Sequence, residues 1–359
     1  MTTTMRDVAR AVGVSLMTVS NVINERPGVG AETRLRVLEA VDRLDYEVNL
    51  TARRLRTGLT GTIGLIVPRF DHPYFGELAA RLASALATTG RHLSVEQSGA
   101  SAEGELAALS QARLATYDAV LLSVVGLRYE DVDKFQTSVP IVLLGEQGMP
   151  PRFDHVQLDN EAGAHLGTAH LIENGARNIL IVGGGDEGRQ SMTSIRTRGW
   201  ERAHADAGLT PRSDGVLRLA ELEVACARVA VRQRLAQTPE VDGIFAITDQ
   251  VAFGVMAGVH DAGLRIPEDV QVVGFDNLAL GEHVTPGLTT IDPSHEWMVQ
   301  RAVELIDQRI AGRDVAPQHL VSPGVLVVRG TTRGGASAGS ARALAELFPA
   351  AALRRESIR

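Results

Sequence analysis

The sequence of 359 residues contains one cysteine, one lysine and no long apolar run. Cys226 cannot form an intrachain disulfide, and no Cys/His spacing typical of a metal site is present. The absence of an apolar stretch of about 18 residues predicts no transmembrane helix, and the N-terminal residues do not resemble an export signal. Catalytic motifs such as G-x-S-x-G are also absent. We therefore expect a cytoplasmic protein that is not an enzyme and has no membrane, metal or cofactor partner.

The charge is unevenly distributed along the chain. The formal net charge is −7, but residues 1–60 hold nine arginines against seven acidic side chains, a net of +2, which leaves −9 for the remainder. A basic head on an acidic body is typical of a DNA-contacting module joined to a ligand-binding domain. The 44% hydrophobic content allows a large core and two or three domains.

Residues 4–24 show the pattern of a helix-turn-helix. Apolar side chains recur at i, i+3, i+4 and i+7 from Met5, Thr4 can cap this helix with Asp7, Gly13 suits the turn, and Ser15 can cap a second helix. The second helix is expected to expose Leu16, Met17, Ser20, Asn21 and Asn24. An ordinary αα-hairpin has a similar pattern, so the remainder of the chain must decide between the two.

A third helix is predicted over about 31–44, burying Val37, Val41, Leu44 and Leu38. Residues 49–56 follow, and they are too few for an isolated helix to be stable in water. Their composition alone is equally consistent with a flexible linker.

Residues 4–65 resemble the head and hinge of the lac repressor family of bacterial transcription regulators. The matching segments are DVARAVGVS, TVSNVIN, ETRLRVLEA, the Leu44-Asp45-Tyr46 turn, NLTARRLRTG and TIGLIVP. The resemblance implies a hinge that folds on cognate DNA, pairs with its dimer mate and wedges Leu55 into the minor groove, bending the site. The residues then expected at DNA are Thr4, Ser15, Leu16, Met17, Thr18, Ser20, Asn21, Asn24, Asn49, Ala52, Arg53, Leu55 and Arg56.

From Thr62 onward, short apolar runs alternate with helical patterns. The runs are 62–67, 118–124, 141–145, 178–183, 242–248 and 270–275, and the helices 75–89, 101–115, 160–174, 192–208, 222–236, 249–262 and 294–311. This alternation predicts doubly wound parallel sheets. Roughly twelve strands are too many for one sheet, which favours two α/β lobes with a cleft at the strand ends. The resemblance likewise implies a periplasmic-binding-protein-like core.

The expected organisation has four parts. An all-α helix-turn-helix head spans 1–48, a hinge 49–59, and an α/β two-lobed core 60–333. Lobe 1 is expected at about 60–160 and 291–321, and lobe 2 at about 161–290 and 322–333, with crossovers near 159–161, 290–292 and 320–324. The Gly/Ala/Ser-rich tail 334–359 is predicted to be mostly disordered, with a weak interaction helix as the alternative.

The loop after the first predicted strand carries candidate ligand-binding side chains. Asp71, His72, Tyr74 and Phe75 place aromatic rings beside a carboxylate and an imidazole, which suits a stacked, hydrogen-bonded small molecule. Core packing is the alternative for at least one of the aromatics. The resemblance places this loop in the effector cleft, with His72 where relatives usually carry Asn.

A second set of candidates lies in the predicted lobe 2. Arg196 falls in the first turns of a helix, where the macrodipole disfavours a cation, so an anionic or polyol partner is indicated. The resemblance assigns effector contacts to Arg196, Asp276, Thr248, Gln190 and Met192. Arg196 and Asp276, facing each other across a cleft, would bind a polyol by donating and accepting hydrogen bonds. Asp249 is expected to cap the helix that follows it.

The segment GGGDEG at 183–188 satisfies the dinucleotide-binding pattern G-x-G-x-x-G. That reading requires a helix at the third glycine and an acidic residue about twenty residues on, at the end of the next strand, which here begins only near Val216. A cleft-edge loop is therefore preferred. His165, His170 and His204 are expected on helix surfaces.

Together these features predict a homodimeric, ligand-controlled transcription factor that acts as a repressor. Helix 15–24 would enter the major groove of a near-palindromic operator, and a carbohydrate-like effector would bind between the lobes. A solute-binding module without DNA function and an NAD-dependent oxidoreductase are the alternatives.

Overall fold

The computed structural model divides into two compact units, Met1–Thr60 and Gly61–Arg359. The structure describes residues 3–23, 26–46, 59–132, 137, 139–145, 151–185, 191–313, 315–333 and 342–343. Seven of the predicted site residues lie outside this part of the chain: Asn24, Asn49, Ala52, Arg53, Leu55, Arg56 and Gln190.

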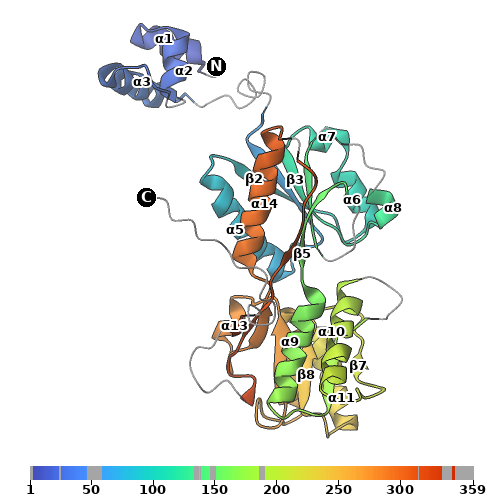
Figure 1. Cartoon of the computed structure of the whole chain (residues 1–359). Coiled ribbons are helices and arrows are strands. Elements are labelled where there is room, and N and C mark those ends of the chain that lie inside the picture. The colour runs from blue at the N-terminus through green and yellow to red at the C-terminus, as the bar shows by residue number, and fades with distance from the viewer. Residues whose placement is uncertain are drawn as a thin grey trace, which may run out of the picture. The chain divides into compact units, whose positions relative to one another are not determined.

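The first unit contains the predicted helices α1 (Met5–Val12), α2 (Leu16–Ile23) and α3 (Ala31–Arg43) (Figure 1). The Asp7 carboxylate accepts hydrogen bonds from the Thr4 backbone N–H at 3.0 Å and from its hydroxyl at 2.6 Å, which fixes the start of α1. Gly13 takes the left-handed conformation with φ 73°. Ser15 Oγ accepts from the Thr18 N–H at 3.1 Å, so Ser15 starts α2 as predicted.

The three helices enclose a small core. Val8, Val19 and Val37 are fully buried, and Tyr46 packs against them from the turn after α3. The prediction that Leu38 is buried is wrong, because this side chain is 44% exposed. The inward face of α3 follows Val37 and Ala40 at i and i+3, and a residue next to Val37 points about 100° away from that face.

Within the described residues, six parallel strands form the first sheet of the second unit, in the order β11-β5-β4-β3-β1-β2. These strands are β1 (Thr62–Val67), β2 (His92–Gln97), β3 (Ala119–Ser123), β4 (Ile141–Leu144), β5 (Asp154–Leu158) and β11 (His319–Ser322). Helices α5 (Pro73–Ala87) and α14 (His295–Ile310) pack on one face. The short helices α6 (Ala102–Ala108), α7 (Gln111–Leu114) and α8 (Tyr129–Val132) contribute to the other face. We call this sheet and its helices lobe 1.

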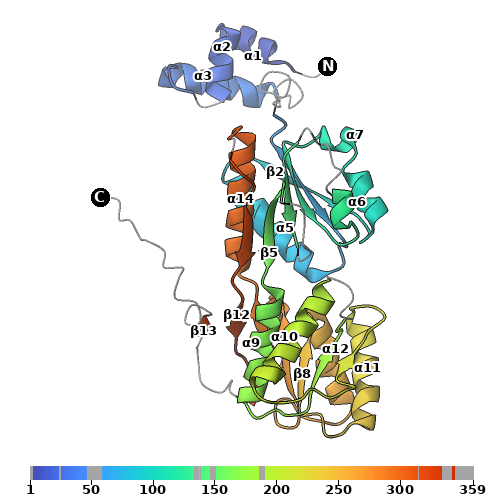
Figure 2. The same ribbon diagram turned by 45° about the vertical axis from the view of Figure 1, so that its right-hand side comes forward.

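The second sheet has the order β13-β12-β10-β9-β8-β6-β7. Its strands are β6 (Ile179–Val182), β7 (Val216–Leu217), β8 (Gly243–Ala246), β9 (Gln271–Phe275), β10 (Thr289–Asp292), β12 (Val325–Val327) and β13 (Arg342–Ala343). The helices are α9 (Asn160–Glu173), α10 (Met192–Asp206), α11 (Val224–Gln237), α12 (Asp249–Asp261) and the short α13 (Leu280–His283). Figure 2 shows α9 and α10 beside β8, with α11 next to α12. We call this sheet and its helices lobe 2.

The chain passes between the lobes three times. β5 of lobe 1 is followed by α9, β10 of lobe 2 by α14, and β11 of lobe 1 by β12. The predicted fold class is confirmed, and each predicted strand run contains an observed strand. The predicted helix 101–115 is instead two helices, because the backbone at Ser110 is extended, with ψ 145°.

Within the segment 334–359, the structure describes only Arg342–Ala343, which form β13 and pair antiparallel with β12 at the edge of the second sheet. The prediction for the rest of this segment lies outside the described residues. Among the described residues, no helix is long and apolar enough to cross a membrane.

Candidate functional site

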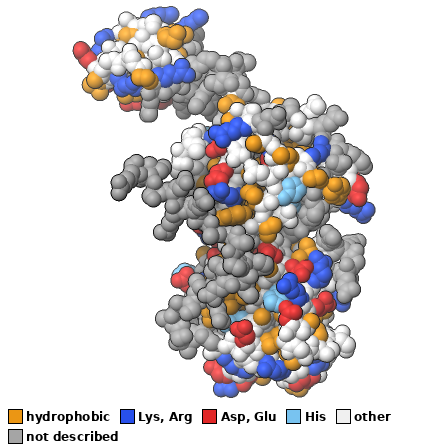
Figure 3. All heavy atoms as spheres, viewed as in Figure 1, with side chains coloured by type: hydrophobic (Ala, Val, Ile, Leu, Met, Phe, Trp, Pro, Cys, Tyr) orange, Lys and Arg blue, Asp and Glu red, His pale blue; other side chains and the backbone are white. Residues whose placement is uncertain are grey.

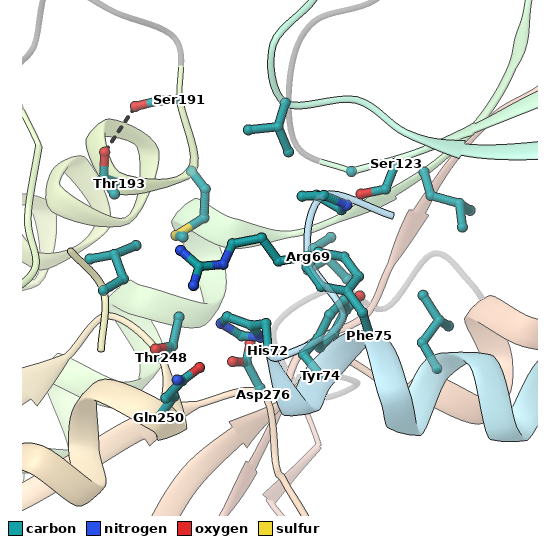
Figure 4. A pocket seen from close by; sticks show the side chains of 18 of the residues that line it. Arg69, His72, Tyr74, Phe75, Ser123, Ser191, Thr193, Thr248, Gln250 and Asp276 are labelled. Atoms are coloured by element: carbon teal, nitrogen blue, oxygen red, sulfur yellow. Dashed lines mark hydrogen bonds between the residues drawn. The ribbon is translucent and has the colours of Figure 1, made fainter. Parts of the chain in front are cut away.

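A cavity of about 550 Å³ lies between the carboxyl ends of the two sheets. Every described residue of the predicted effector set lines it: Asp71, His72, Tyr74, Phe75, Met192, Arg196, Thr248 and Asp276. The first four come from lobe 1 and the others from lobe 2. Figure 4 shows His72, Thr248, Gln250 and Asp276 converging, with Tyr74 and Phe75 beside them.

Arg196 is the most constrained polar side chain of the cavity wall. It is 1% exposed, its Nε donates to Asn160 Oδ1 at 2.7 Å, and its Nη1 donates to the Ile247 carbonyl oxygen. The guanidinium also lies over the Phe275 ring, 3.5 Å from its centroid. Gly199 lets α10 approach α9 closely, because a Cβ there would stand 2.3 Å from the Glu161 carbonyl oxygen. The helix packing and these bonds fix the guanidinium before any ligand binds.

Asp276 pairs with this guanidinium, with Oδ1 3.7 Å from Nη1. Both residues belong to lobe 2, so the prediction that they face each other across the cleft is wrong. The reason is that α10 and β9 belong to the same lobe, and the Arg196 guanidinium lies over Phe275, the last residue of β9 and the neighbour of Asp276. The pair therefore presents one combined donor and acceptor surface from a single wall.

The loop that carries Asp276 has an unusual backbone. Asp276 and Asn277 have φ values of 125° and 51°, which side-chain-bearing residues rarely adopt. The Asp249 carboxylate holds the loop by accepting from the Leu278 N–H at 2.8 Å and the Thr290 hydroxyl at 2.5 Å. The Asn277 amide donates to Asp292 Oδ2 at 3.2 Å, at the end of β10. Strain at the loop is thus balanced by a buried hydrogen-bond network.

Asp249 does not cap α12, contrary to the prediction. Thr248 takes this position and accepts from the Val251 N–H at 3.2 Å, while Asp249 is the first helical residue and is completely buried. Burial raises the pKa of the Asp249 carboxyl to about 6, against the lowering effect of its hydrogen bonds from Thr290 and Leu278. Its position beneath the Asp276 loop makes it a support for the cavity wall.

The lobe 1 wall is aromatic. The rings of Tyr74 and Phe75 meet edge to face with centroids 5.1 Å apart, and His72 lies 5.6 Å from Phe75. Both aromatics line the cavity and also pack against the lobe 1 core, so the core-packing alternative applies to both, and their contact with a ligand stays a prediction. Burial, followed by the nearby charge of Arg196, lowers the pKa of His72 to about 4. The imidazole is therefore neutral at physiological pH.

Hydrogen-bonded contacts between described residues join the lobes around the cavity. Arg69 of lobe 1 meets Glu223 of lobe 2 at 3.2 Å. Glu77 of α5 accepts from the Ala279 N–H at 2.9 Å, and the His295 ring, at the start of α14, lies 2.6 Å from the Asp276 carbonyl oxygen. The last contact ties the start of α14 in lobe 1 directly to the Asp276 loop of lobe 2.

Several lining residues were not predicted. They are Arg69, Ser123, Ser191, Thr193, Glu221, Glu223 and Gln250. Gln250 lies two residues after Thr248, close to the end of β8, and this position could have identified it as a cavity residue. Glu223 precedes α11 after a segment with no regular pattern, and sequence periodicity does not point to it.

Two further expectations can be compared with the structure. His204 is not on a helix surface but is 1% exposed, because it packs edge to face against Trp200 one turn earlier, with ring centroids 4.6 Å apart. After the glycine segment 183–188, the helix begins only at Met192, which does not fit a dinucleotide-binding turn.

Among the described residues, no group of His, Cys, Asp and Glu side chains is arranged to hold a metal ion.

The head exposes an apolar pair on α2. Leu16 and Met17 are 45% and 70% exposed, and Asn21 is half-buried beside them. Figure 3 shows basic side chains next to exposed hydrophobic ones on the visible face of this unit. Ser20 departs from the predicted reading face, because it is only 8% exposed and turns toward the helical core next to Val19.

A helix-turn-helix head with an exposed second helix, followed by a two-lobed α/β core with a polar cleft, defines a ligand-responsive DNA-binding regulator. Comparison with known proteins agrees. Residues 4–49 match the family described as "Bacterial regulatory proteins, lacI family", and residues 168–332 match "Periplasmic binding protein-like domain". The chain is 32% identical over 335 residues to the ribose operon repressor of Halalkalibacterium halodurans, covering 93% of this chain and 98% of that protein.

Solved structures give the same result. A lac repressor dimer bound to operator and the anti-inducer ONPF has a TM-score of 0.76 at 25% identity, over 92% of this chain and 99% of that one. A complex of the transcriptional regulator CelR with cellobiose has a TM-score of 0.66 at 28% identity, over the same shares. The chain belongs to the lacI family of bacterial transcriptional repressors, with a DNA-binding head and an effector-binding core.

Proposed function

We propose that this repressor binds a polyhydroxylated, carbohydrate-like effector in the cavity between its lobes. The observation that carries the proposal is the buried Arg196–Asp276 pair of one wall set opposite the Tyr74 and Phe75 rings of the other. Paired donors and acceptors suit vicinal hydroxyl groups, and aromatic rings suit the apolar faces of a sugar. A cellobiose complex of a related regulator supports this class of ligand.

The head is proposed to read a near-palindromic operator as part of a homodimer. Leu16 and Met17 are positioned to contact thymine methyl groups, and Asn21 to pair with adenine. The hinge residues Asn49, Ala52, Arg53, Leu55 and Arg56, together with Thr4, Ser15, Thr18 and Asn24, complete the proposed DNA surface. A two-fold axis between heads would give the operator its symmetry.

Effector and operator would then act as linked equilibria. The His295 contact to the Asp276 carbonyl oxygen and the Arg69–Glu223 pair join the lobes at the cavity, so filling it favours one lobe arrangement. That arrangement would help or prevent pairing of the two hinges, with a coupling of about 1–3 kcal/mol.

The proposal also includes the chain's organisation and setting. Residues 1–48 act as the head, 49–59 as the hinge and 60–333 as the effector core, in which Gln190 completes the effector set. The cavity binds and releases its ligand without chemical conversion, and the protein acts in the cytoplasm, where its operator is.

An operator titration with and without effector tests the proposal. A thermal-shift screen of sugars and polyols, with purine bases as the control class, would identify a ligand, and fluorescence anisotropy would then follow operator binding. Leu55→Ala should weaken operator binding much more than non-specific binding at fixed salt. Equal losses, or an effector that leaves operator affinity unchanged, would contradict the proposal.

A further inference from the structure

The described part of the cavity wall holds more carboxylates than guanidinium groups. Among the described residues that line it, the guanidinium groups of Arg69 and Arg196 stand against four carboxylates, those of Asp71, Glu221, Glu223 and Asp276. This balance gives the described wall a formal charge of −2. A ligand that enters the cavity meets an excess of negative charge.

Arg196 is already committed to groups of the protein. Its hydrogen bonds go to Asn160 and the Ile247 carbonyl oxygen, its plane lies over Phe275, and its charge is balanced by Asp276 at 3.7 Å. An acidic ligand would have to displace the Asp276 carboxylate or approach within a few ångströms of it. A hydroxyl group has no such difficulty, because it can donate to Asp276 while accepting from Arg196.

Arg69 is committed in the same way. Its Nε and Nη2 donate to the two oxygens of Asp71 at 2.8 and 2.5 Å, and Nη2 also meets Glu223 at 3.2 Å. The hydrogen bonds from Arg69 hold the pKa of the Asp71 carboxyl below its usual value, so this carboxylate stays ionised. Arg69 therefore brings no unbalanced positive charge into the cavity.

His72 does not supply the missing cation. Its imidazole faces the cavity beside Arg196, and its burial and this neighbour together favour the neutral form. A neutral imidazole can donate or accept a hydrogen bond to a hydroxyl group, but it does not neutralise a carboxylate or phosphate.

We propose that the effector of this repressor carries no acidic group: it is an uncharged or amine-bearing polyhydroxylated compound, and sugar acids and sugar phosphates are rejected. The inference rests on the proposed function of the cavity and specifies its ligand class. Rejection comes from like-charge repulsion in a partly desolvated cleft, where charges interact more strongly than in water.

Matched ligands test the proposal on the full-length protein. Neutral hexoses and disaccharides are each titrated calorimetrically beside the corresponding uronate and 6-phosphate, at one pH and ionic strength. We expect each acidic derivative to bind about tenfold more weakly than its neutral parent, or worse, which corresponds to about 1.4 kcal/mol. An acidic derivative that binds as tightly as its parent overturns this inference, whereas a complete lack of polyol binding contradicts the proposed function itself.

A charge-removing variant tests the cause. Glu223→Gln should reduce the ratio of neutral-ligand to acidic-ligand affinity at least about threefold, because it lowers the negative charge of the wall and removes one of the two carboxylates that pair with Arg69. Glu240→Gln is the matched control, since Glu240 also pairs with an arginine, Arg212, at similar side-chain exposure but does not line the cavity. An unchanged ratio in Glu223→Gln, or an equal change in both variants, would overturn the electrostatic origin of the selectivity.

Discussion

The lobe 2 wall of the cleft holds buried polar groups in place before any ligand arrives, whereas the lobe 1 wall is more exposed and carries the aromatic rings. Arg196, Thr248 and Asp276 are each at most 3% exposed and have hydrogen-bond or ionic partners within lobe 2. Asp71 lies in solvent contact, and His72 is half-buried between aromatic rings.

From this difference we infer separate tasks for the two walls in the proposed ligand binding. A rigid polar wall can discriminate between ligands by hydrogen-bond geometry, because its groups pay little ordering cost on binding. An aromatic wall on the other lobe supplies contact area and moves with that lobe. Ligand recognition would therefore be concentrated in lobe 2, and the response to the ligand in lobe 1.

The largest expected effect concerns the rigid wall. Arg196→Ala should destabilise the protein by about 3–5 kcal/mol, because it leaves the buried Asp276 carboxylate without its cation. It should also abolish the response to ligand. Urea denaturation measures the first effect, and operator binding with and without ligand measures the second. The control is Arg198→Ala, whose part-exposed pair with Glu161 should contribute less than about 1 kcal/mol; equal losses would refute the contrast.

A second prediction concerns how protein stability depends on pH through His72 of the lobe 1 wall. His72 has a pKa of about 4 in the folded chain, against about 6.5 unfolded. Between these values the unfolded chain binds more protons, so the stability from His72 is complete above pH 6.5 and lost as the pH falls toward 4. Between pH 7 and pH 4.5, the free energy of unfolding, measured by urea denaturation, should fall by about 2 kcal/mol more in the wild-type protein than in His72→Asn. Substitution of the exposed His283 should leave the wild-type profile intact, and a parallel profile for His72→Asn would contradict the expectation.

A smaller effect is expected from the contact area of lobe 1. Phe75→Ala should weaken ligand binding about tenfold, or about 1.4 kcal/mol, because it removes one face of the aromatic wall. Titration calorimetry measures the loss. Phe70→Ala is the control, in the loop just before α5: this ring is 57% exposed and does not line the cavity, so its removal should not change affinity.

The smallest effect concerns a single cap on the rigid wall. Thr248→Ala should cost about 1 kcal/mol of stability, since it removes the side chain that accepts from the Val251 N–H at the start of α12. Urea denaturation provides the measurement. A loss above about 3 kcal/mol would mean that Thr248 belongs to the buried network around Asp249 instead of acting as a cap.

The sequence allowed the scaffold to be predicted well because its signals are local. Apolar runs such as 62–67 and 270–275 mark buried parallel strands, and the residues that follow them fall at one edge of the sheet. This logic placed His72, Thr248 and Asp276 in one cavity. The periodicity of α3 also identified Val37 as buried. Leu38 was predicted to be buried because leucine is apolar, although it lies outside that periodicity.

The sequence could not predict which side chains of the cavity wall pair with one another. Whether Arg196 meets Asp276 within a lobe or across the cleft depends on strand order, which no single segment encodes. The exchange of roles between Thr248 and Asp249 depends on Thr290 and Leu278, both distant in sequence. The burial of Ser20 likewise depends on how α2 rotates against its neighbours.

The interleaving of the lobes along the chain has a consequence during synthesis. β5 of lobe 1 ends at Leu158, but its outer neighbour β11 begins only at His319, after most of lobe 2 has been made. At about 5–20 residues per second, the nascent sheet would wait roughly ten to thirty seconds for that edge. Until α14 leaves the ribosome, the apolar face that Met298 and Leu305 later cover stays open. During this interval, newly made chains expose an apolar face that the finished protein covers, which makes them more prone to aggregate than the finished protein.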